Sequence, residues 1–177
     1  GAPAQYWAAT EGSRSRPFVR GRPASWSYVD EDVFVGEYDR SVDGAGRVAL
    51  PSTFRELLGE RCYATRDPQG CIVLRTPARY SREAKRLAEM EERGELQSGA
   101  GRALSTRTVI VGVDKQGRVT LDEPNRRFAA IDAGGQATVI GNGYTIEIWR
   151  PSRWAIVRSE DFNQTPDRVW PAEVDAR

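Results

Sequence analysis

Two arginines in this chain occupy the same place in a repeated pattern, Asp-x-x-Gly-Arg. The first copy runs from Asp43 to Arg47, and the second runs from Asp114 to Arg118. A guanidinium group is a planar fork of N–H donors that suits a phosphate or the edge of a guanine. Arg47 and Arg118 are therefore the best candidates for contact with a nucleic acid. The alternative is that each arginine pairs with the aspartate of its own turn.

The other residues of the pattern are expected to shape the turns. Aspartate suits the first position of a type I turn, and glycine suits the last position because it accepts a positive φ. A carboxylate facing phosphate is repelled, so we do not expect the aspartates to contact DNA. The expected turn-forming residues are Asp43, Gly46, Asp114 and Gly117. Three further cations are expected on the same face as phosphate contacts: Lys115, Arg40 and Arg107.

The composition argues against catalysis and against metal binding. The chain has no histidine, which is the commonest general base and the commonest transition-metal ligand, and it has only two cysteines, Cys62 and Cys71. We expect no enzyme activity, no metal site and no cofactor. A hairpin that turns at residues 67–70 would place Cys71 opposite Arg66 and away from Cys62. The two cysteines are therefore expected to be small apolar side chains and not a redox pair.

The charge balance restricts how the chain could bind a polyanion. Its 26 lysines and arginines almost cancel its 25 aspartates and glutamates, for a net charge of +1. A DNA-binding protein of this composition must gather its positive charge on one face. No segment reaches the ~20 apolar residues of a membrane helix, and no apolar region near the start is typical of a signal peptide. The sequence is expected to be cytoplasmic.

An internal repeat divides the chain into two related modules. Residues 41–50 match residues 112–121, which puts Asp43 and Asp114 71 positions apart (114 − 43). Residues 77–80 match residues 151–154 with an offset of 74 (151 − 77), so one small length difference lies between the two blocks. Two matches in the same order indicate a duplicated structural unit.

Both modules are expected to contain the same elements. A strand at 33–38 or 108–113 leads into the turn, and the chain returns along 48–50 or 119–121. A short helix and a second hairpin follow, the hairpin covering 62–74 around 67–70 or 137–149 around 141–143. The residues that predict the helices are Phe54, Leu57, Leu58 and Gly59 in the first module, and Asp122, Phe128 and Ile131 in the second.

Five segments are expected along the chain. Residues 1–32 are expected to be a flexible arm that contacts phosphates nonspecifically, or sequence that precedes the natural start at Val33. Residues 33–80 and 106–155 are the two modules. Residues 81–105 are expected to be a helical linker. A helix is predicted at 78–93, and its mixed charge favours packing or contact between subunits over DNA recognition. Residues 156–177 are expected to be a polar tail.

Three motifs in order resemble the MraZ family: residues 33–51, 113–118 and 144–149. The resemblance covers about residues 33–155. It implies a β-rich α+β fold in which two tandem AbrB-like modules exchange β-hairpins. These modules would form one double-split β-barrel, an internal pseudo-dimer, with linker helices. The sequence departs from the family pattern at Ala45, where lysine is frequent, at Asp122, which replaces a proline, and in its N-terminal extension.

The resemblance also implies a function. Proteins of this family are DNA-binding transcriptional regulators, usually repressors, that recognise short tandem repeats in the promoter of the cell-division and cell-wall gene cluster, which includes their own gene. The implied partners are double-stranded DNA and further copies of the chain in a ring-shaped homo-oligomer, associated with the nucleoid and not with a membrane. Two alternatives remain open from the sequence: an AbrB-like antitoxin and a structural ring-forming protein.

Overall fold

The computed structural model describes residues 33–164, which form eight strands and five helices. The expected N-terminal arm, residues 1–32, and the last part of the expected tail, residues 165–177, lie outside the described residues. The strands are β1 (Phe34–Ser41), β2 (Arg47–Ala49), β3 (Arg61–Asp67), β4 (Cys71–Arg75), β5 (Thr108–Gly112), β6 (Arg118–Thr120), β7 (Gln136–Gly143) and β8 (Thr145–Trp149). The helices are α1 (Ser52–Leu58), α2 (Pro77–Glu92), α3 (Ala100–Thr106), α4 (Glu123–Ala129) and α5 (Pro151–Gln164).

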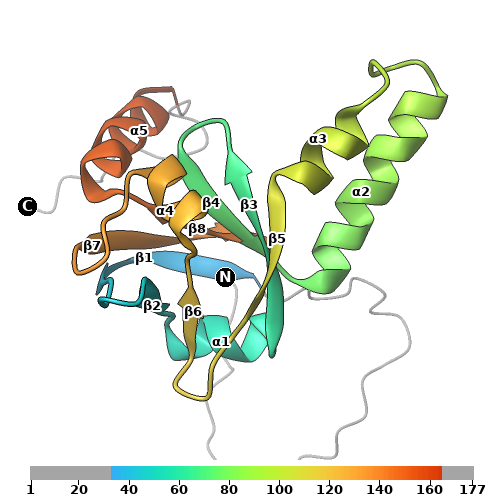
Figure 1. Cartoon of the computed structure of the whole chain (residues 1–177). Coiled ribbons are helices and arrows are strands. Elements are labelled where there is room, and N and C mark those ends of the chain that lie inside the picture. The colour runs from blue at the N-terminus through green and yellow to red at the C-terminus, as the bar shows by residue number, and fades with distance from the viewer. Residues whose placement is uncertain (1–32, 165–177) are drawn as a thin grey trace, which may run out of the picture. The chain divides into compact units, whose positions relative to one another are not determined.

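The main sheet is antiparallel and interleaves the two modules (Figure 1). Its strand order is β1-β7-β8-β4-β3-β5. The first strand of each module pairs with the hairpin of the other module: β1 of the first module pairs with β7 of the second, and β5 of the second pairs with β3 of the first. Exchanging corresponding strands (β1 with β5, β3 with β7, β4 with β8) reproduces the same order from the other edge. The two modules are thus related by an approximate two-fold axis between β4 and β8. The prediction of a β-rich α+β fold is confirmed.

A separate two-stranded ribbon joins the modules a second time. Its strands β2 and β6 are antiparallel, with Val48 directly opposite Val119. Both valines are fully buried. Each ribbon strand continues from its own turn through a single bridge, Val42 to Val48 in the first module and Val113 to Val119 in the second. The returning strands begin one residue earlier than expected from the sequence, at Arg47 and Arg118.

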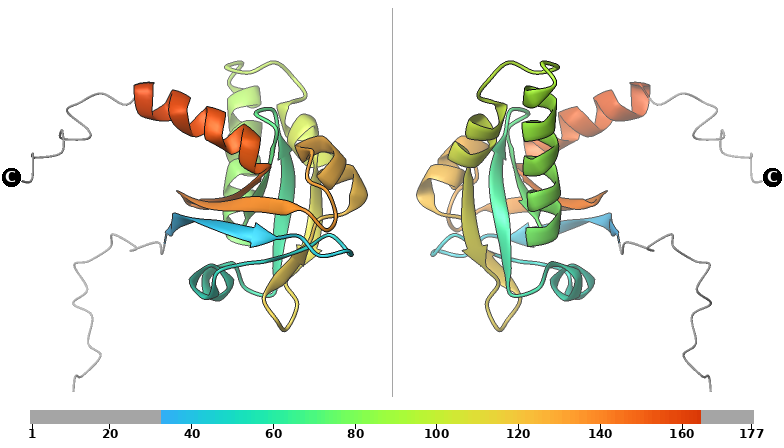
Figure 2. Two further views of the ribbon diagram at one scale, coloured as in Figure 1. Left: turned by 90° about the vertical axis from the view of Figure 1, so that its left-hand side faces the viewer. Right: turned by 90° about the vertical axis from the view of Figure 1, so that its right-hand side faces the viewer.

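Strand β4 shows how the core is divided between the two faces of the sheet. All five of its side chains are buried, and four of them alternate between two apolar clusters. Ile72 and Leu74 belong to the larger cluster, which includes residues of α1, whereas Cys71 and Val73 belong to a smaller one that contains Val157 of α5. Figure 2 shows α5 and α1 on opposite sides of β1 and β7. The alternation is what period-two geometry requires of a strand covered on both faces.

The two cysteines lie on opposite faces of this sheet. Cys62 belongs to the larger cluster and Cys71 to the smaller, and both are buried and free, which confirms that they do not pair. Burial raises the pKa of the Cys62 thiol to about 12 and raises the pKa of Cys71 as well, so neither is a thiolate at neutral pH. The register expected from the sequence is wrong by one position, because Cys71 faces Asp67 and not Arg66.

Two expectations about the second module and one about the tail differ from the structure. The hairpin expected around 141–143 turns at Gly143 and Tyr144, since Asn142 pairs with Thr145 and Gly141 lies within β7. Phe128, expected on the apolar side of the helix, is 42% exposed, because α4 buries its residues 125 and 129 instead. The expected polar tail from residue 156 begins as helix, since α5 continues to Gln164.

Helices α2 and α3 pack against each other beside the sheet (Figure 1). The Tyr80 ring of α2 stacks on Tyr63 of β3 with the ring centroids 4.2 Å apart. At the other end of the pair, the Glu91 carboxylate accepts hydrogen bonds from the backbone N–H groups of Gly99 and Gly101, where α3 begins. None of the described helices is long and apolar enough to cross a membrane.

The tight packing of β7 on β1 at Gly141 provides a test of the interleaved sheet. A Cβ added at Gly141 of β7 would lie 2.4 Å from the backbone of residues 34 and 35 in β1. Gly141→Ala is expected to force the β1–β7 pair apart and lower the free energy of unfolding by about 1–3 kcal/mol or more. The measurement is urea denaturation followed by circular dichroism.

A second glycine gives the matched control. Gly101 in α3 has open space where a Cβ would be added. Gly101→Ala should be neutral or stabilise by up to about 1 kcal/mol. An equal decrease in stability in both variants would contradict the close packing of β1 on β7.

Candidate nucleic-acid interface

Both Asp-x-x-Gly-Arg turns have the same internal hydrogen bonds. In the first, the amide of Gly46 donates to the carbonyl of Asp43 (2.9 Å), and the Asp43 carboxylate accepts from the amides of Ala45 and Arg47. Gly46 has a φ of +78°, which favours glycine. The second turn repeats these bonds at Asp114, with the amides of residues 116 and 118 as donors and a φ of +76° at Gly117.

Each motif arginine pairs with the aspartate of its own turn. Arg47 Nε lies 2.6 Å from Asp43 Oδ2, and Arg118 Nε lies 2.8 Å from Asp114 Oδ2. Arg118 Nη1 is also 3.9 Å from Asp43 Oδ2, so the guanidinium groups of both modules approach one carboxylate. The alternative that the sequence left open, pairing within the turn, is thus the arrangement in the free protein.

The ribbon places both motif arginines on its outer face. Arg47 lies opposite Thr120 and Arg118 lies opposite Ala49, while the buried pair Val48 and Val119 lies between them. Because successive side chains of a strand point to opposite faces, the arginines must share the face that the valines do not use. Their side chains are 40% and 26% exposed. Both guanidinium groups are therefore accessible from one side of the molecule.

Two of the three other expected cations lie near this outer face. Arg40 in β1 donates from Nε to the carbonyl of Ala49 in β2 (3.2 Å), and its guanidinium lies 5.4 Å from the centre of the Tyr38 ring. Lys115 is exposed in the second turn, and no described residue pairs with it. The first turn has Gly44 at the corresponding position, so the two turns differ in charge.

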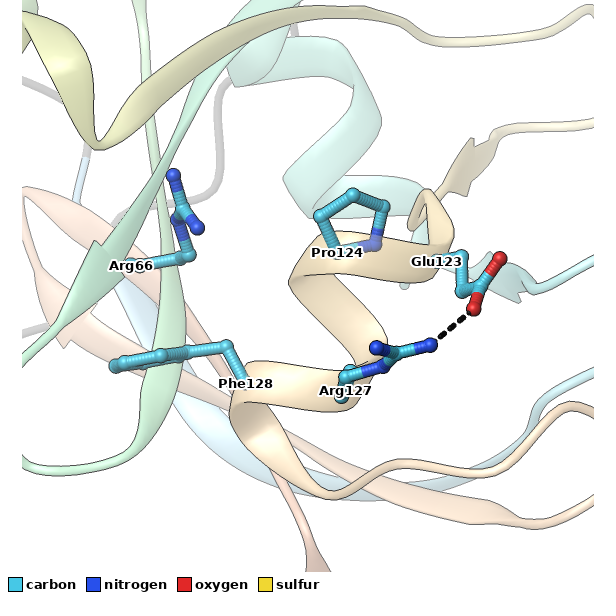
Figure 3. Close-up of a pocket in the computed structure, with 5 residues that line it drawn as sticks. All are labelled: Arg66, Glu123, Pro124, Arg127 and Phe128. Carbon is cyan, nitrogen blue, oxygen red and sulfur yellow. Dashed lines mark hydrogen bonds and ion pairs between the residues drawn. The ribbon is translucent and has the colours of Figure 1, made fainter.

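Arg107 does not join the other candidates. It precedes β5, and the whole length of that extended strand separates it from the second turn, roughly 20 Å at ~3.3 Å per residue. Arg107 instead lines a hollow with Arg66, Thr106 and the exposed Phe128. A neighbouring hollow has a volume of about 480 Å³. Figure 3 shows that Arg66 and Phe128 line it and that Arg127 of α4 pairs there with Glu123.

Sequence reasoning missed two arginines that contact the turns. Arg126 of α4 lies against Gly46, and Arg55 of α1 lies against Gly117. Their positions differ by 71 (126 − 55), the same offset that relates the two turns. The signal that could have identified them is this shared offset, which continues from the turns into the helices.

Hydrogen bonds lower the pKa of both turn aspartates. For Asp43 the main cause is the bond from the Arg47 amide, and for Asp114 it is the bond from the Arg118 amide. A carboxyl group whose folded-state pKa is depressed stabilises the turn fully above its usual value of ~3.9. That stabilisation disappears as the pH falls through the lower, folded-state pKa.

The turns are therefore expected to keep their structure from pH 8 down to about pH 4 and to open only in stronger acid. The measurement is an NMR titration of the Arg47 and Arg118 amide shifts. Asp43→Asn should remove the acid transition at Arg47 and leave the one at Arg118. A transition midpoint above pH 4 at either amide would contradict the assignment of these bonds.

Several curated proteins are similar to this chain over most of its length. Transcriptional regulator MraZ of Micrococcus luteus is 34% identical over 147 residues, which is 78% of this chain and 98% of that protein. The regulators of the same name from Roseiflexus castenholzii (31% identity, 72% of this chain, 87% of that protein) and a Nocardioides species (35%, 68% and 83%) are similar in extent. No family model matches the chain. On the identity and coverage of these relatives, the chain belongs to the MraZ family of transcriptional regulators.

Proposed function

We propose that this protein regulates transcription by binding double-stranded DNA with the outer face of the β2–β6 ribbon. The observation that carries the proposal is the accessibility of Arg47 and Arg118 on that single face, opposite the buried valines. A two-stranded ribbon has the right width for the major groove of B-DNA. Membership of a family whose relatives are named as transcriptional regulators supports the same conclusion.

The ion pairs of the free protein are compatible with this role. Exposed arginine–aspartate pairs contribute little to stability, so exchanging the carboxylate for a DNA acceptor costs little. A bidentate arginine–guanine contact is worth about 1–3 kcal/mol of discrimination between bases. While the arginine changes partner, the aspartate keeps its bonds to the backbone amides and so preserves the turn. Lys115 and Arg40 would add contacts to phosphate, whereas Arg107 lies before β5, at the end of that strand far from the second turn, and would not take part.

The finer features of the proposal follow from the resemblance. The interleaved modules would be a double-split barrel of the AbrB-like kind. Several copies would assemble into a ring in the cytoplasm, associated with the nucleoid, and would present their ribbons to short tandem repeats. Such multivalency raises the effective concentration of weak individual contacts, which a chain of net charge +1 needs. The regulated promoter would be that of the division and cell-wall cluster, with repression as the outcome and no catalysis.

Replacing both motif arginines tests the proposal. The combined change Arg47→Ala and Arg118→Ala is expected to abolish binding to a duplex from upstream of the protein's own gene. The oligomer should persist, because both side chains lie outside the core. Gel shift measures DNA binding and light scattering measures the mass of the assembly. For each arginine that binds a phosphate, its removal should also reduce the slope of log K against log salt by about 0.9.

Arg107→Ala is the matched control, since it removes an arginine of the same charge far from the ribbon, and it should retain most of the affinity. Unchanged binding by the double variant would refute the ribbon as the interface. An assembled wild-type protein that binds no DNA would favour the structural-ring alternative, and specific capture of a toxin would favour the antitoxin alternative.

A further inference from the structure

Each turn of the ribbon is covered by an arginine from the helix of the other module. A Cβ added at Gly117 would lie 1.6 Å from Cδ and 2.5 Å from Nε of Arg55, so the arginine stem occupies the space that a side chain there would need. At Gly46 the corresponding distances are 2.7 Å to Nε and 3.1 Å to Cδ of Arg126. Both glycines are buried although they close exposed turns.

This contact is a second reason, besides the positive φ, why these two turn positions require glycine. Asparagine can adopt a positive φ at modest cost, but any side chain at these positions would displace the covering arginine. The aliphatic stem of an arginine can lie on the turn while its charged end extends toward solvent. The covering arginine therefore packs directly on each glycine, in the space that a side chain there would need.

Backbone hydrogen bonds around the turns also join each module to the turn of the other module. The amide of Leu50 in the first module donates to the carbonyl of Gly117 in the second, and the amide of Leu121 donates to the carbonyl of Gly46, both at 2.9 Å. Arg126 Nε donates to the carbonyl of Leu121 (3.1 Å), which ties the covering arginine to the same strand end. Each turn is thus held by the module to which it does not belong.

The covering arginines also change the charge of the turns. Asp43 and Arg47 are one anion and one cation, so the first turn is neutral, whereas Lys115 beside the pair of Asp114 and Arg118 gives the second turn a net positive charge. Arg126 adds a cation beside the first turn and Arg55 adds one beside the second.

We propose that Arg55 and Arg126 are positioning residues for DNA binding, each holding the Asp-x-x-Gly-Arg turn of the opposite module. The inference rests on the proposed DNA-binding function. It predicts that a change in the first module's helix disturbs the second module's turn, and the reverse. A general weakening of packing would disturb both turns alike, so the crosswise pattern separates positioning from ordinary core stability.

The first experiment uses the full-length protein without DNA. In Arg55→Ala, hydrogen exchange of the Gly117 and Arg118 amides should speed up about tenfold, while exchange at Gly46 and Arg47 stays within twofold of wild type. Arg126→Ala should give the opposite pattern. Arg86→Ala, which removes an exposed arginine of α2, should change neither turn. Equal effects on both turns, or no effect on either, would overturn the inference.

The second experiment is a pair of double-mutant cycles on binding to the upstream duplex. Arg55→Ala alone should weaken binding about tenfold. Combined with Arg118→Ala, whose turn it covers, it should weaken binding little further, because the positioned side chain is already gone. Combined with Arg47→Ala, its effect should multiply. Additive effects in both combinations would overturn the positioning role.

Arg55→Lys keeps the charge and serves if the alanine variant fails to fold. Lysine also has an aliphatic stem that can lie on the turn, so it should retain both the salt dependence of binding and the protection of the Gly117 amide. Loss of that protection in Arg55→Lys would contradict the covering role. If wild-type protein fails to bind the duplex, the proposed function fails, while the exchange pattern still decides whether these arginines hold the turns. If wild type binds and Arg55→Ala changes neither turn exchange nor affinity, only this inference fails.

Discussion

The pairing of Val48 with Val119 in the β2–β6 ribbon fixes the arrangement of the two motif arginines. The ribbon has three residues in each strand, so the central pair alone decides which residues point inward. With both valines buried, Arg47 and Arg118 must point outward. A slip of one residue would exchange the two sets and bury two guanidinium groups, which is prohibitively unfavourable. The hydrophobic register and the exposure of the two motif arginines are therefore a single constraint, and it involves both modules.

Local sequence rules identified the parts of the structure whose causes are local. The Asp43 and Asp114 turns, the end of α1 at Gly59 and the cap of α4 by Asp122 each depend on the conformation and hydrogen bonds of a few adjacent residues. The duplication itself was also visible, because it preserves residue identities at a fixed offset. From these alone, a β-rich fold of two related modules could be predicted.

The remaining features depend on contacts between residues distant in sequence. Phe128 has an apolar side chain at a helical spacing, yet it is exposed because α4 turns its residues 125 and 129 to the core. Arg107 resembles the other cations near the second turn in sequence, but the extended strand β5 carries it away from them. The crosswise contacts of Arg55 and Arg126 join one module's helix to the other module's turn. No rule based on neighbouring residues can predict such partners.

The two modules are related but not identical, and several of the differences lie where DNA would bind. The second turn carries Lys115 where the first has Gly44, and Arg40 flanks the ribbon at Ala49 of the first module. Arg126 has an acceptor for its Nε, whereas the Nε of Arg55 is buried without a partner among the described residues. A symmetric dimer matches a palindromic site, because its two halves make equal contacts. A fused pair with unequal turns is asymmetric, so its two halves make unequal contacts. Such contacts are best satisfied by a DNA site that is also asymmetric and not palindromic. Under the proposed function, repeats arranged head to tail would meet this condition, and each further copy of the protein would then bind in the same orientation as the last.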